Sequence, residues 1–201
     1  MRPPGGANVV IHERGLMGPL FVILFGMDEI KLVKPTLEYK HEVLEYRAEF
    51  LDDHNVIHGS GGLERFGSYE EWLKACDDGE HSEKVPKDRV PATQFLAIRN
   101  SDGKLVGMIS VRHSLNEFLK MVGGHIGYSV RESERRKGYA TQMLGSALVK
   151  CKELGIEQVL ITCEPTNPGS AGAIKANGGI YVKQVATEDY GKLDHYRVTI
   201  P

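Results

Sequence analysis

The chain of 201 residues has the length of one ordinary globular domain, and 41% of its residues are hydrophobic and 26% charged. Its formal net charge of -2 argues against a dedicated nucleic-acid-binding surface, because such domains are usually markedly basic. The three cysteines form neither a disulfide framework nor a zinc-ligand spacing, which favours a reducing cytoplasm and predicts no metal site.

The first 26 residues differ in composition from the rest of the chain. They are rich in Gly and Pro and carry an apolar run from Leu16 to Phe25. The run is about half as long as a transmembrane helix requires, and no small-x-small cleavage site of a signal peptide follows it. We therefore interpret residues 1–26 as an upstream extension or non-native leader and residues 27–201 as the domain, with no membrane contact. The alternative is an extra strand or an interface segment, which a second subunit of a homodimer would cover.

The domain begins with an alternating strand and an amphipathic helix. Residues 30–33 precede Pro35 and predict the strand, and residues 36–50 predict a helix with Thr36 as its N-cap. Residues 51–67 form a long polar loop, which indicates a functional or mobile segment. Its aspartate and histidine side chains have no known metal-ligand spacing, so we interpret them as a polar turn.

A capping box marks the next helix. Ser68 and Glu71 have the S-x-x-E spacing that opens a helix, and Trp72 follows as a predicted core residue. Residues 78–91 are charged and contain two prolines, so they predict another loop. Beyond them, β-rich runs predict strands at residues 93–99, 105–112, 125–130, 158–163, 179–186 and 195–200, the first two joined by a hairpin turn and the last two paired as a hairpin.

The clearest periodic segment is a helix that ends at Gly155, a typical C′ glycine. One apolar face at 3.6-residue spacing contains Ala140, Met143, Leu144, Ala147, Leu148, Cys151 and Leu154. We therefore predict Cys151 to be a small core residue, and likewise Cys163 at the end of a later strand.

The loop before this helix is basic and contains a glycine. Arg135, Arg136 and Lys137 precede Gly138, and Ala140 keeps the first helical turn open. The first N–H groups of a helix lack intrahelical partners and the macrodipole is positive there, so the pattern predicts a pyrophosphate site. The alternative is an ordinary helix N-terminus with a solvated basic cap.

The motif Arg135-x-x-Gly138-x-Ala140 resembles the Q/R-x-x-G-x-G/A signature of the GNAT N-acetyltransferase superfamily. Asn167 and Ser170, followed by a short helical run and an Asn-Gly-Gly sequence, resemble the family's second conserved segment. The resemblance covers residues 124–182. It implies an α/β fold with a single mixed, mostly antiparallel sheet of about six to seven strands flanked by helices.

The resemblance also implies acetyl-CoA as co-substrate and assigns residues to it. The pantetheine arm would lie beside the strand residues Tyr128, Ser129 and Val130, one of whose amides would hydrogen-bond the thioester oxygen. The pyrophosphate would bind at Arg135, Arg136, Lys137, Gly138, Tyr139, Ala140 and Thr141, and the other side of the coenzyme would contact Asn167 and Ser170.

The nucleophile would be the amine of the acceptor, which must lose a proton to react. His125 stands closest to the family's position for a general base, and its intrinsic pKa suits that role. The alternative is a hydrogen-bonded structural histidine, and Glu64 and His113 are weaker candidates for the base. The family's usual tyrosine, which protonates the departing thiolate, is replaced here by Ile174.

The leading hypothesis is an acetyl-CoA-dependent N-acetyltransferase acting on a primary amine of an unidentified small molecule or peptide. A coenzyme A-binding sensor without catalysis is the alternative. A nucleotide-binding doubly wound domain is disfavoured, because a meander rather than repeated βαβ units precedes the key helix. Acidic loops would favour a polyamine or aminoglycoside acceptor, and an open groove would favour a protein terminus or a lysine. The loops contain Asp52, Asp53, Asp77, Asp78 and Glu80, which is a mild acidic bias and leaves both alternatives open.

Overall fold

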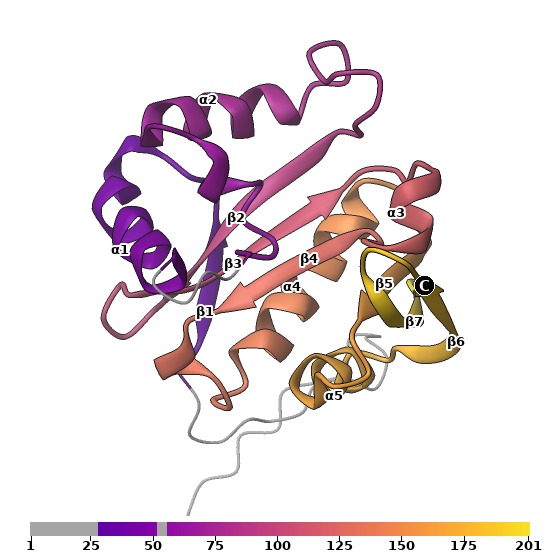
Figure 1. Cartoon of the computed structure of the whole chain (residues 1–201). Coiled ribbons are helices and arrows are strands. Elements are labelled where there is room, and N and C mark those ends of the chain that lie inside the picture. Colours follow the sequence, from indigo (N-terminus) through magenta and orange to yellow (C-terminus); the bar gives the residue numbers. More distant parts are fainter. Residues whose placement is uncertain (1–27, 52–55) are drawn as a thin grey trace, which may run out of the picture.

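The computed structural model describes residues 28–51 and 56–201 (Figure 1). The predicted extension, residues 1–26, lies outside the described residues. So does the part of the polar loop at residues 52–55, which includes two of the acidic residues considered for the acceptor.

Seven strands and five α-helices make up the described chain, together with three short 3₁₀ helices, η1 (Leu37–Tyr39), η2 (Leu63–Arg65) and η3 (Glu132–Glu134). The strands are β1 (Ile30–Val33), β2 (Ala92–Arg99), β3 (Leu105–Arg112), β4 (Ile126–Val130), β5 (Gln158–Cys163), β6 (Ile180–Thr187) and β7 (Gly191–Thr199). The helices are α1 (Lys40–Leu51), α2 (Tyr69–Gly79), α3 (Glu117–Met121), α4 (Tyr139–Glu153) and α5 (Pro168–Ala176).

The strands confirm the predicted fold class and strand number. β1-β2-β3-β4 form one antiparallel sheet, and β5-β7-β6 form a second. The two sheets meet where the His125 N–H donates to the Leu160 carbonyl at 2.7 Å. Beyond this contact, the described residues of β4 and β5 form no ladder with each other. The sheet that was predicted to be single is therefore divided between β4 and β5.

Helices cover both faces of the four-stranded sheet, with α1 and α2 on one face and α4 on the other (Figure 1). Side chains of a strand alternate between the faces, so Ile126 packs in the core under α4 while Ser129 faces α1. The core under α4 includes Phe95, Ile109, Val111, Met143, Leu144, Ala147, Val159 and Ile161. The core under α1 and α2 includes Val43, Tyr46, Leu63, Trp72, Leu96 and Met108.

Local signals place most elements as predicted. Ser68 and Glu71 form the capping box, and Trp72 is fully buried. Gly155 ends α4 with φ 72°, and its N–H donates to the Lys152 carbonyl at 2.9 Å. Burial raises the pKa of the Cys151 thiol to about 12, as expected for a core cysteine.

Two further expectations differ from the structure, and a connection with no predicted element contains a helix. This connection, between the predicted strands 105–112 and 125–130, contains α3, whose N-cap Asn116 accepts a hydrogen bond from the Leu119 N–H at 2.9 Å. Thr36 makes no side-chain cap bond, because the chain first enters the 3₁₀ turn η1 before α1. Leu154 is 43% exposed, because it lies at the end of α4 beyond the last residue that packs on the sheet.

Candidate active site

Within residues 28–51 and 56–201, the division between the two sheets leaves the outer edge of β4 without a strand partner from the Gly127 level onward. β4 pairs with β3 on one side, and β5 pairs with β7. The start of β4 contacts β5 through His125 and Leu160. Farther along, β4 contacts α5, where Tyr128 Oη lies 2.8 Å from Ser170 Oγ. The open end of this gap lies beside the start of α4.

The free edge of β4 presents alternate backbone groups. Along a strand of an antiparallel ladder, every second residue directs its backbone N–H and carbonyl to the same neighbouring strand. The Arg131 N–H donates to the Val106 carbonyl, and the His125 carbonyl accepts from the Arg112 N–H, which sets the register of β4 with β3. Odd-numbered residues therefore bond β3, and the backbone of Tyr128 and Val130 faces the gap. Of the three predicted pantetheine partners, Ser129 has its backbone directed to β3, and its hydroxyl contacts the Tyr46 hydroxyl at 3.0 Å.

The N-terminus of α4 lies at the open end. Gly138 is its N-cap with φ 78°, in the left-handed region that favours glycine, and no side chain caps the helix. Its first turn contains no acidic residue. Arg136 also has a positive φ of 61°, so the loop turns sharply before the helix. The first amides of α4 therefore have no side-chain acceptor in the described chain, which suits an incoming phosphate.

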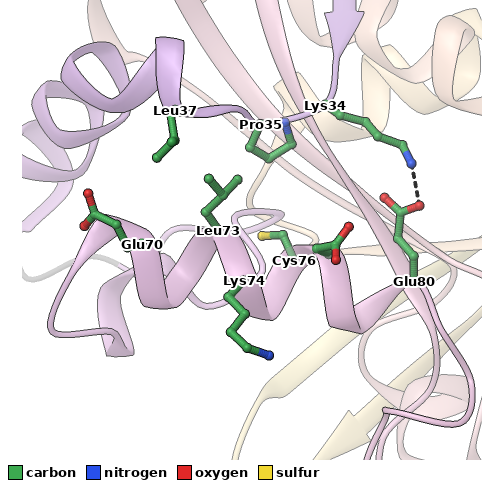
Figure 2. Close-up of a pocket in the computed structure, with 9 residues that line it drawn as sticks. Lys34, Pro35, Leu37, Glu70, Leu73, Lys74, Cys76 and Glu80 are labelled. Atoms are coloured by element: carbon green, nitrogen blue, oxygen red, sulfur yellow. Dashed lines mark hydrogen bonds and ion pairs between the residues drawn. The ribbon is translucent and has the colours of Figure 1, made fainter.

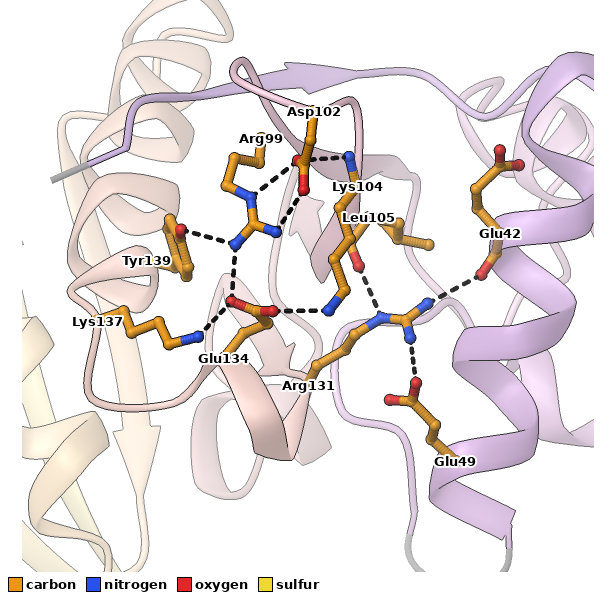
Figure 3. A network of polar contacts seen from close by, with 10 residues as sticks. All are labelled: Glu42, Glu49, Arg99, Asp102, Lys104, Leu105, Arg131, Glu134, Lys137 and Tyr139. Carbon is orange, nitrogen blue, oxygen red and sulfur yellow. Dashed lines mark hydrogen bonds and ion pairs between the residues drawn. The ribbon is translucent and has the colours of Figure 1, made fainter.

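A buried carboxylate holds this loop in place. Glu134 is 4% exposed and accepts hydrogen bonds from Arg99 at 2.9 Å, Lys104 at 2.7 Å and Lys137 at 2.9 Å (Figure 3). Arg99 and Lys104 flank the β2–β3 hairpin turn. The network therefore fastens the loop before α4 to the sheet, and the position of the helix N-terminus depends on it.

The predicted basic residues are divided between this network and the gap. Arg135 donates through Nε to the Val130 carbonyl at 3.3 Å, while Arg136 is exposed. Lys137 pairs with Glu134, and Tyr139 is buried with its hydroxyl accepting from Arg99 at 3.2 Å. The side chains of Lys137 and Tyr139 are thus used within the protein.

Helix α5 provides the other wall of the gap. Asn167 caps it by accepting from the Ser170 N–H at 2.9 Å, and Ser170 Oγ lies 2.8 Å from Tyr128 Oη. The Cys163 thiol, whose pKa is raised by burial, also lies near Ser170. The structure therefore brings Asn167, Ser170 and Tyr128 together, and their contact with a coenzyme stays a prediction.

The residue at the family's tyrosine position does not reach the gap. Ile174 is fully buried in the core under α4, and a Cβ at Gly179 would lie 2.3 Å from its Cγ2. A hydroxyl that does border the gap is that of Tyr128, from β4, which lies beside Ser170 of α5. Burial raises its pKa to about 12, so the hydroxyl is protonated at neutral pH.

His125 lies where β4 and β5 meet, on the same face of β4 as Ser129. Its Nδ1 accepts from the Leu160 N–H at 2.9 Å, and the residue is 9% exposed. Burial lowers its pKa. A lone pair that accepts from a backbone N–H cannot take a second proton without losing that bond, so the contact favours the structural alternative. The role of general base stays a prediction that substitution can test.

We expect His125→Ala to destabilise the protein by about 1–3 kcal/mol, because the Leu160 N–H loses its acceptor. The pH dependence of kcat/KM should stay unchanged. Thermal denaturation and a pH–rate profile measure the two effects. Loss of an inflection below pH 6.5 in the variant would instead identify His125 as the base.

The weaker base candidates are also engaged within the protein. Glu64 Oε2 accepts from Ser60 Oγ at 3.2 Å. His113 Nε2 lies 2.9 Å from Thr93 Oγ1, and burial lowers its pKa. Among the described residues, no cluster of three or more His, Cys, Asp or Glu side chains could hold a metal ion.

The loop before η2 passes directly over β4 on the α1 face, which the sequence did not reveal. Gly59 has φ 73°, and a Cβ there would lie 2.2 Å from the Gly127 carbonyl oxygen. Gln94 donates to the Gly59 carbonyl at 2.8 Å, and Trp72 donates to the Ser60 carbonyl at 2.7 Å. A glycine-rich loop was the only available signal, because its contact spans distant segments. The loop forms a wall on the face opposite α4.

A separate hollow of about 350 Å³ lies between the end of β1 and α2. Leu37, Leu73 and Cys76 line it, and the Lys34–Glu80 ion pair at 2.5 Å borders one end (Figure 2). None of the predicted coenzyme residues lines it. Burial raises the pKa of the Cys76 thiol to about 12, which disfavours a reactive thiolate there.

The fold and the sequence agree with one family. Residues 37–180 match the family model described as an acetyltransferase (GNAT) domain. No curated protein sequence matches the chain significantly. None of the described helices has the length and apolarity to cross a membrane.

Three solved structures illustrate the shared fold. A Vibrio cholerae protein proposed to be a ribosomal-protein-serine acetyltransferase is 18% identical, with a TM-score of 0.60, covering 92% of this chain and 100% of its own. Microcin C7 self-immunity acetyltransferase MccE, in complex with acetyl-CoA and AMP, is 16% identical, with a TM-score of 0.59. The match covers 86% of this chain and 93% of MccE. The ribosomal L7/L12 α-N-protein acetyltransferase RimL, in complex with coenzyme A, is 17% identical, with a TM-score of 0.59. The match covers 85% of this chain and 94% of RimL.

These identities are low, so the structures show the fold, while the family model covers well over half of the chain. With the glycine-started helix α4 beside the divided sheet, the chain belongs to the GNAT acetyltransferase family.

Proposed function

We propose that this protein is an N-acetyltransferase that uses acetyl-CoA to acetylate a primary amine of a small molecule or peptide. The observation that carries the proposal is the gap between β4 and β5 with the uncapped N-terminus of α4 at its open end. Acetyl-CoA would supply an activated acetyl thioester when bound.

The residues around the gap fit the parts of acetyl-CoA. The first amides of α4, with Gly138, would hold the pyrophosphate, and exposed Arg136 adds a positive charge beside them. The backbone of Tyr128 and Val130 offers donors and acceptors to the amides of a pantetheine arm, much as an added strand would. Asn167 and Ser170 border the opposite side.

Charge that develops on the thioester oxygen needs a donor fixed before the reaction. The N–H groups of Tyr128 and Val130 lie on a strand that β3 holds in place, so they are oriented without reorganisation. A donor of this kind contributes a few kcal/mol to transition-state stabilisation in acyl transfer. We assign the oxyanion donor to one of these two amides.

The departing sulfur needs a proton that Ile174 cannot supply. Tyr128 Oη is held beside Ser170 Oγ and keeps its proton at neutral pH, so Tyr128 is our candidate proton donor. A thiolate is also a fair leaving group without help, so we expect this donor to speed the reaction rather than to be indispensable.

The test is release of free thiol from acetyl-CoA in the presence of a panel of amines. We expect amine-dependent release by the unmodified protein and a kcat about 10-fold lower in Tyr128→Phe, with KM for acetyl-CoA little changed, because one proton donor is lost. Cys163→Ser serves as a control that alters the neighbouring thiol but retains the Tyr128 hydroxyl.

Thiol release that no amine stimulates, together with calorimetric binding of acetyl-CoA, would contradict the enzyme. The second candidate, a coenzyme A-binding sensor, would then account for the site. Equal kcat values for Tyr128→Phe and the unmodified protein would remove Tyr128 from the mechanism but leave the transferase in place.

A further inference from the structure

The guanidinium of Arg112 lies at the end of β3, on the face of the sheet that α1 and α2 cover. Its Nη1 donates to the Gly123 carbonyl at 3.0 Å and to the Gly124 carbonyl at 2.9 Å. The chain turns sharply at Gly124, with φ 61°, and packs there so closely on β5 that a Cβ would lie 2.4 Å from the Leu160 carbonyl oxygen. The two carbonyls therefore hold the guanidinium in a fixed position.

This cation has no carboxylate partner among the described residues, unlike the other arginines at the sheet. Arg99 pairs with Asp102 and Glu134, and Arg131 pairs with Glu49 (Figure 3). Burial lowers the pKa of Arg112, with no opposing effect from a nearby acidic group. A half-buried charge without a counter-ion is costly, so its position calls for an anion from outside the described chain.

The free side of the guanidinium points along β4 toward the candidate site. A Cβ on Gly127 would lie 3.5 Å from Arg112 Nη2, and Gly127 is two residues before Ser129 on the same face. The described residues contain three deeply buried side-chain atoms without partners, Glu42 Oε2, Arg47 Nε and Gln94 Oε1. Nη2 of Arg112 makes no hydrogen bond to the described residues and is not among those atoms, so solvent reaches it.

Two glycines border the space beside this nitrogen. Gly127 has no side chain, and a Cβ there would also lie 3.4 Å from the Gly59 nitrogen, on the loop that bonds to Gln94 and Trp72 hold in place. His125 lies close enough that the Arg112 charge contributes to lowering its pKa. The site thus combines a fixed cation, glycine backbone and a neutral imidazole on the face of β4 that α1 covers.

We propose that Arg112 binds an oxyanion of the acceptor, so that the preferred substrates are amines that also carry a carboxylate or a phosphonate-like group. This inference rests on the proposed transferase, whose reacting carbon would lie near Tyr128 and Val130. The guanidinium lies beside Gly127, and each strand residue advances about 3.3 Å, so the amine and the oxyanion would be separated by roughly 3–10 Å. Short ω-amino acids span this distance.

The test compares amines of similar length that differ in the terminal group. The probes are 4-aminobutyrate, 3-aminopropylphosphonate and 1-butylamine, with glycine and 6-aminohexanoate to bracket the length. We expect the unmodified protein to prefer at least one anionic probe over 1-butylamine by about 10- to 100-fold in kcat/KM. Arg112→Met should remove this preference, so that the ratio of kcat/KM between the anionic probes and 1-butylamine falls to about one. The better of the first two probes tells a carboxylate site from a phosphonate site.

Two further variants separate the charge from other effects. Arg112→Lys retains the charge and should keep part of the preference. Lys152→Met removes one positive charge from the exposed end of α4 and should keep all of it. Circular dichroism checks that each variant is folded, and Arg112→Gln, which is also neutral but has an amide that can donate to a backbone carbonyl, takes the place of Arg112→Met if the latter does not fold. An equal use of anionic and neutral probes by the unmodified protein, or a preference that survives in Arg112→Met, would overturn the proposal.

Calorimetry with the same probes distinguishes failure of this site from failure of the transferase. If the protein loaded with coenzyme A binds an anionic probe, and Arg112→Met does not, the oxyanion site stands even when no acetyl transfer occurs. If transfer to 1-butylamine proceeds and no anionic probe binds more tightly than 1-butylamine, the transferase stands and the oxyanion site is rejected. If no probe binds and none is acetylated, the oxyanion site is also rejected.

Discussion

Gly138→Asp is expected to weaken binding of coenzyme A by at least about 100-fold, a loss of roughly 3 kcal/mol. The N-cap of α4 has φ 78° and lies where the first helical amides are free of side-chain partners. An aspartate would add bulk and a negative charge at the place proposed for the pyrophosphate, and it would itself attract the amide donors. Titration calorimetry with coenzyme A measures the effect.

Gly191→Asp is the matched control. Gly191 has φ 64° at the start of β7, and nothing lies within 4 Å of a Cβ there, so the substitution brings similar backbone strain and charge outside the network that holds the loop before α4. Its affinity for coenzyme A should equal that of the unmodified protein. If Gly138→Asp also binds with unchanged affinity, the pyrophosphate does not bind at this helix.

Glu134→Gln should lower the free energy of unfolding by about 2 kcal/mol. The carboxylate is 4% exposed and neutralises Arg99, Lys104 and Lys137, which would lose their shared counter-ion. Breaking a fully buried pair costs about 3–5 kcal/mol, and this value is reduced because both lysines reach solvent. Urea denaturation measures the loss. Glu132→Gln in the same turn is exposed and should change stability by less than about 0.5 kcal/mol.

The same carboxylate should make stability depend on pH in a defined range. Burial alone would raise the pKa of Glu134, but hydrogen bonds from Lys104 and Lys137 and the charge of Arg99 outweigh it and lower the pKa to about 2. A glutamate in the unfolded chain titrates near 4.3. Its stabilisation is therefore complete above about pH 4.3 and is lost as the pH falls toward 2.

The unmodified protein and Glu134→Gln should thus differ most above about pH 5 and converge below it. Urea denaturation at a series of pH values between 3 and 7 follows the difference. If the difference in unfolding free energy between the two proteins stays constant from pH 3 to 7, the charge of Glu134 does not contribute to stability.

The sequence was sufficient for features that arise within a few consecutive residues. The capping box at Ser68 and the C′ glycine at Gly155 were predicted because their hydrogen bonds join neighbours in the chain. The glycine start of α4 was predicted for the same reason, since Gly138 and the free helical amides are adjacent, and phosphate binding there stays a prediction. The motif at Arg135 then connected this local geometry to a family.

The tertiary structure decided features that depend on distant segments. The family resemblance implied one sheet, whereas β4 and β5 part beyond His125, because the register of β4 with β3 and of β5 with β7 is set by separate contacts. Nothing in the local sequence showed that Ile174 is buried or that the Tyr128 hydroxyl reaches Ser170. These positions follow from which face of each element packs on the core.

The charged residues show most clearly the difference between what the local sequence determines and what the tertiary structure determines. A basic cluster is visible in the sequence, but whether a cation is neutralised or free depends on partners from other elements. Lys137 is bound by Glu134, whereas Arg112, in an unremarked strand, has no acidic partner among the described residues. Local sequence thus determined the helix N-terminus and its proposed affinity for phosphate. Long-range packing determined which side chains face the acceptor, because burial and pairing of charge exist only once the strands and loops are assembled.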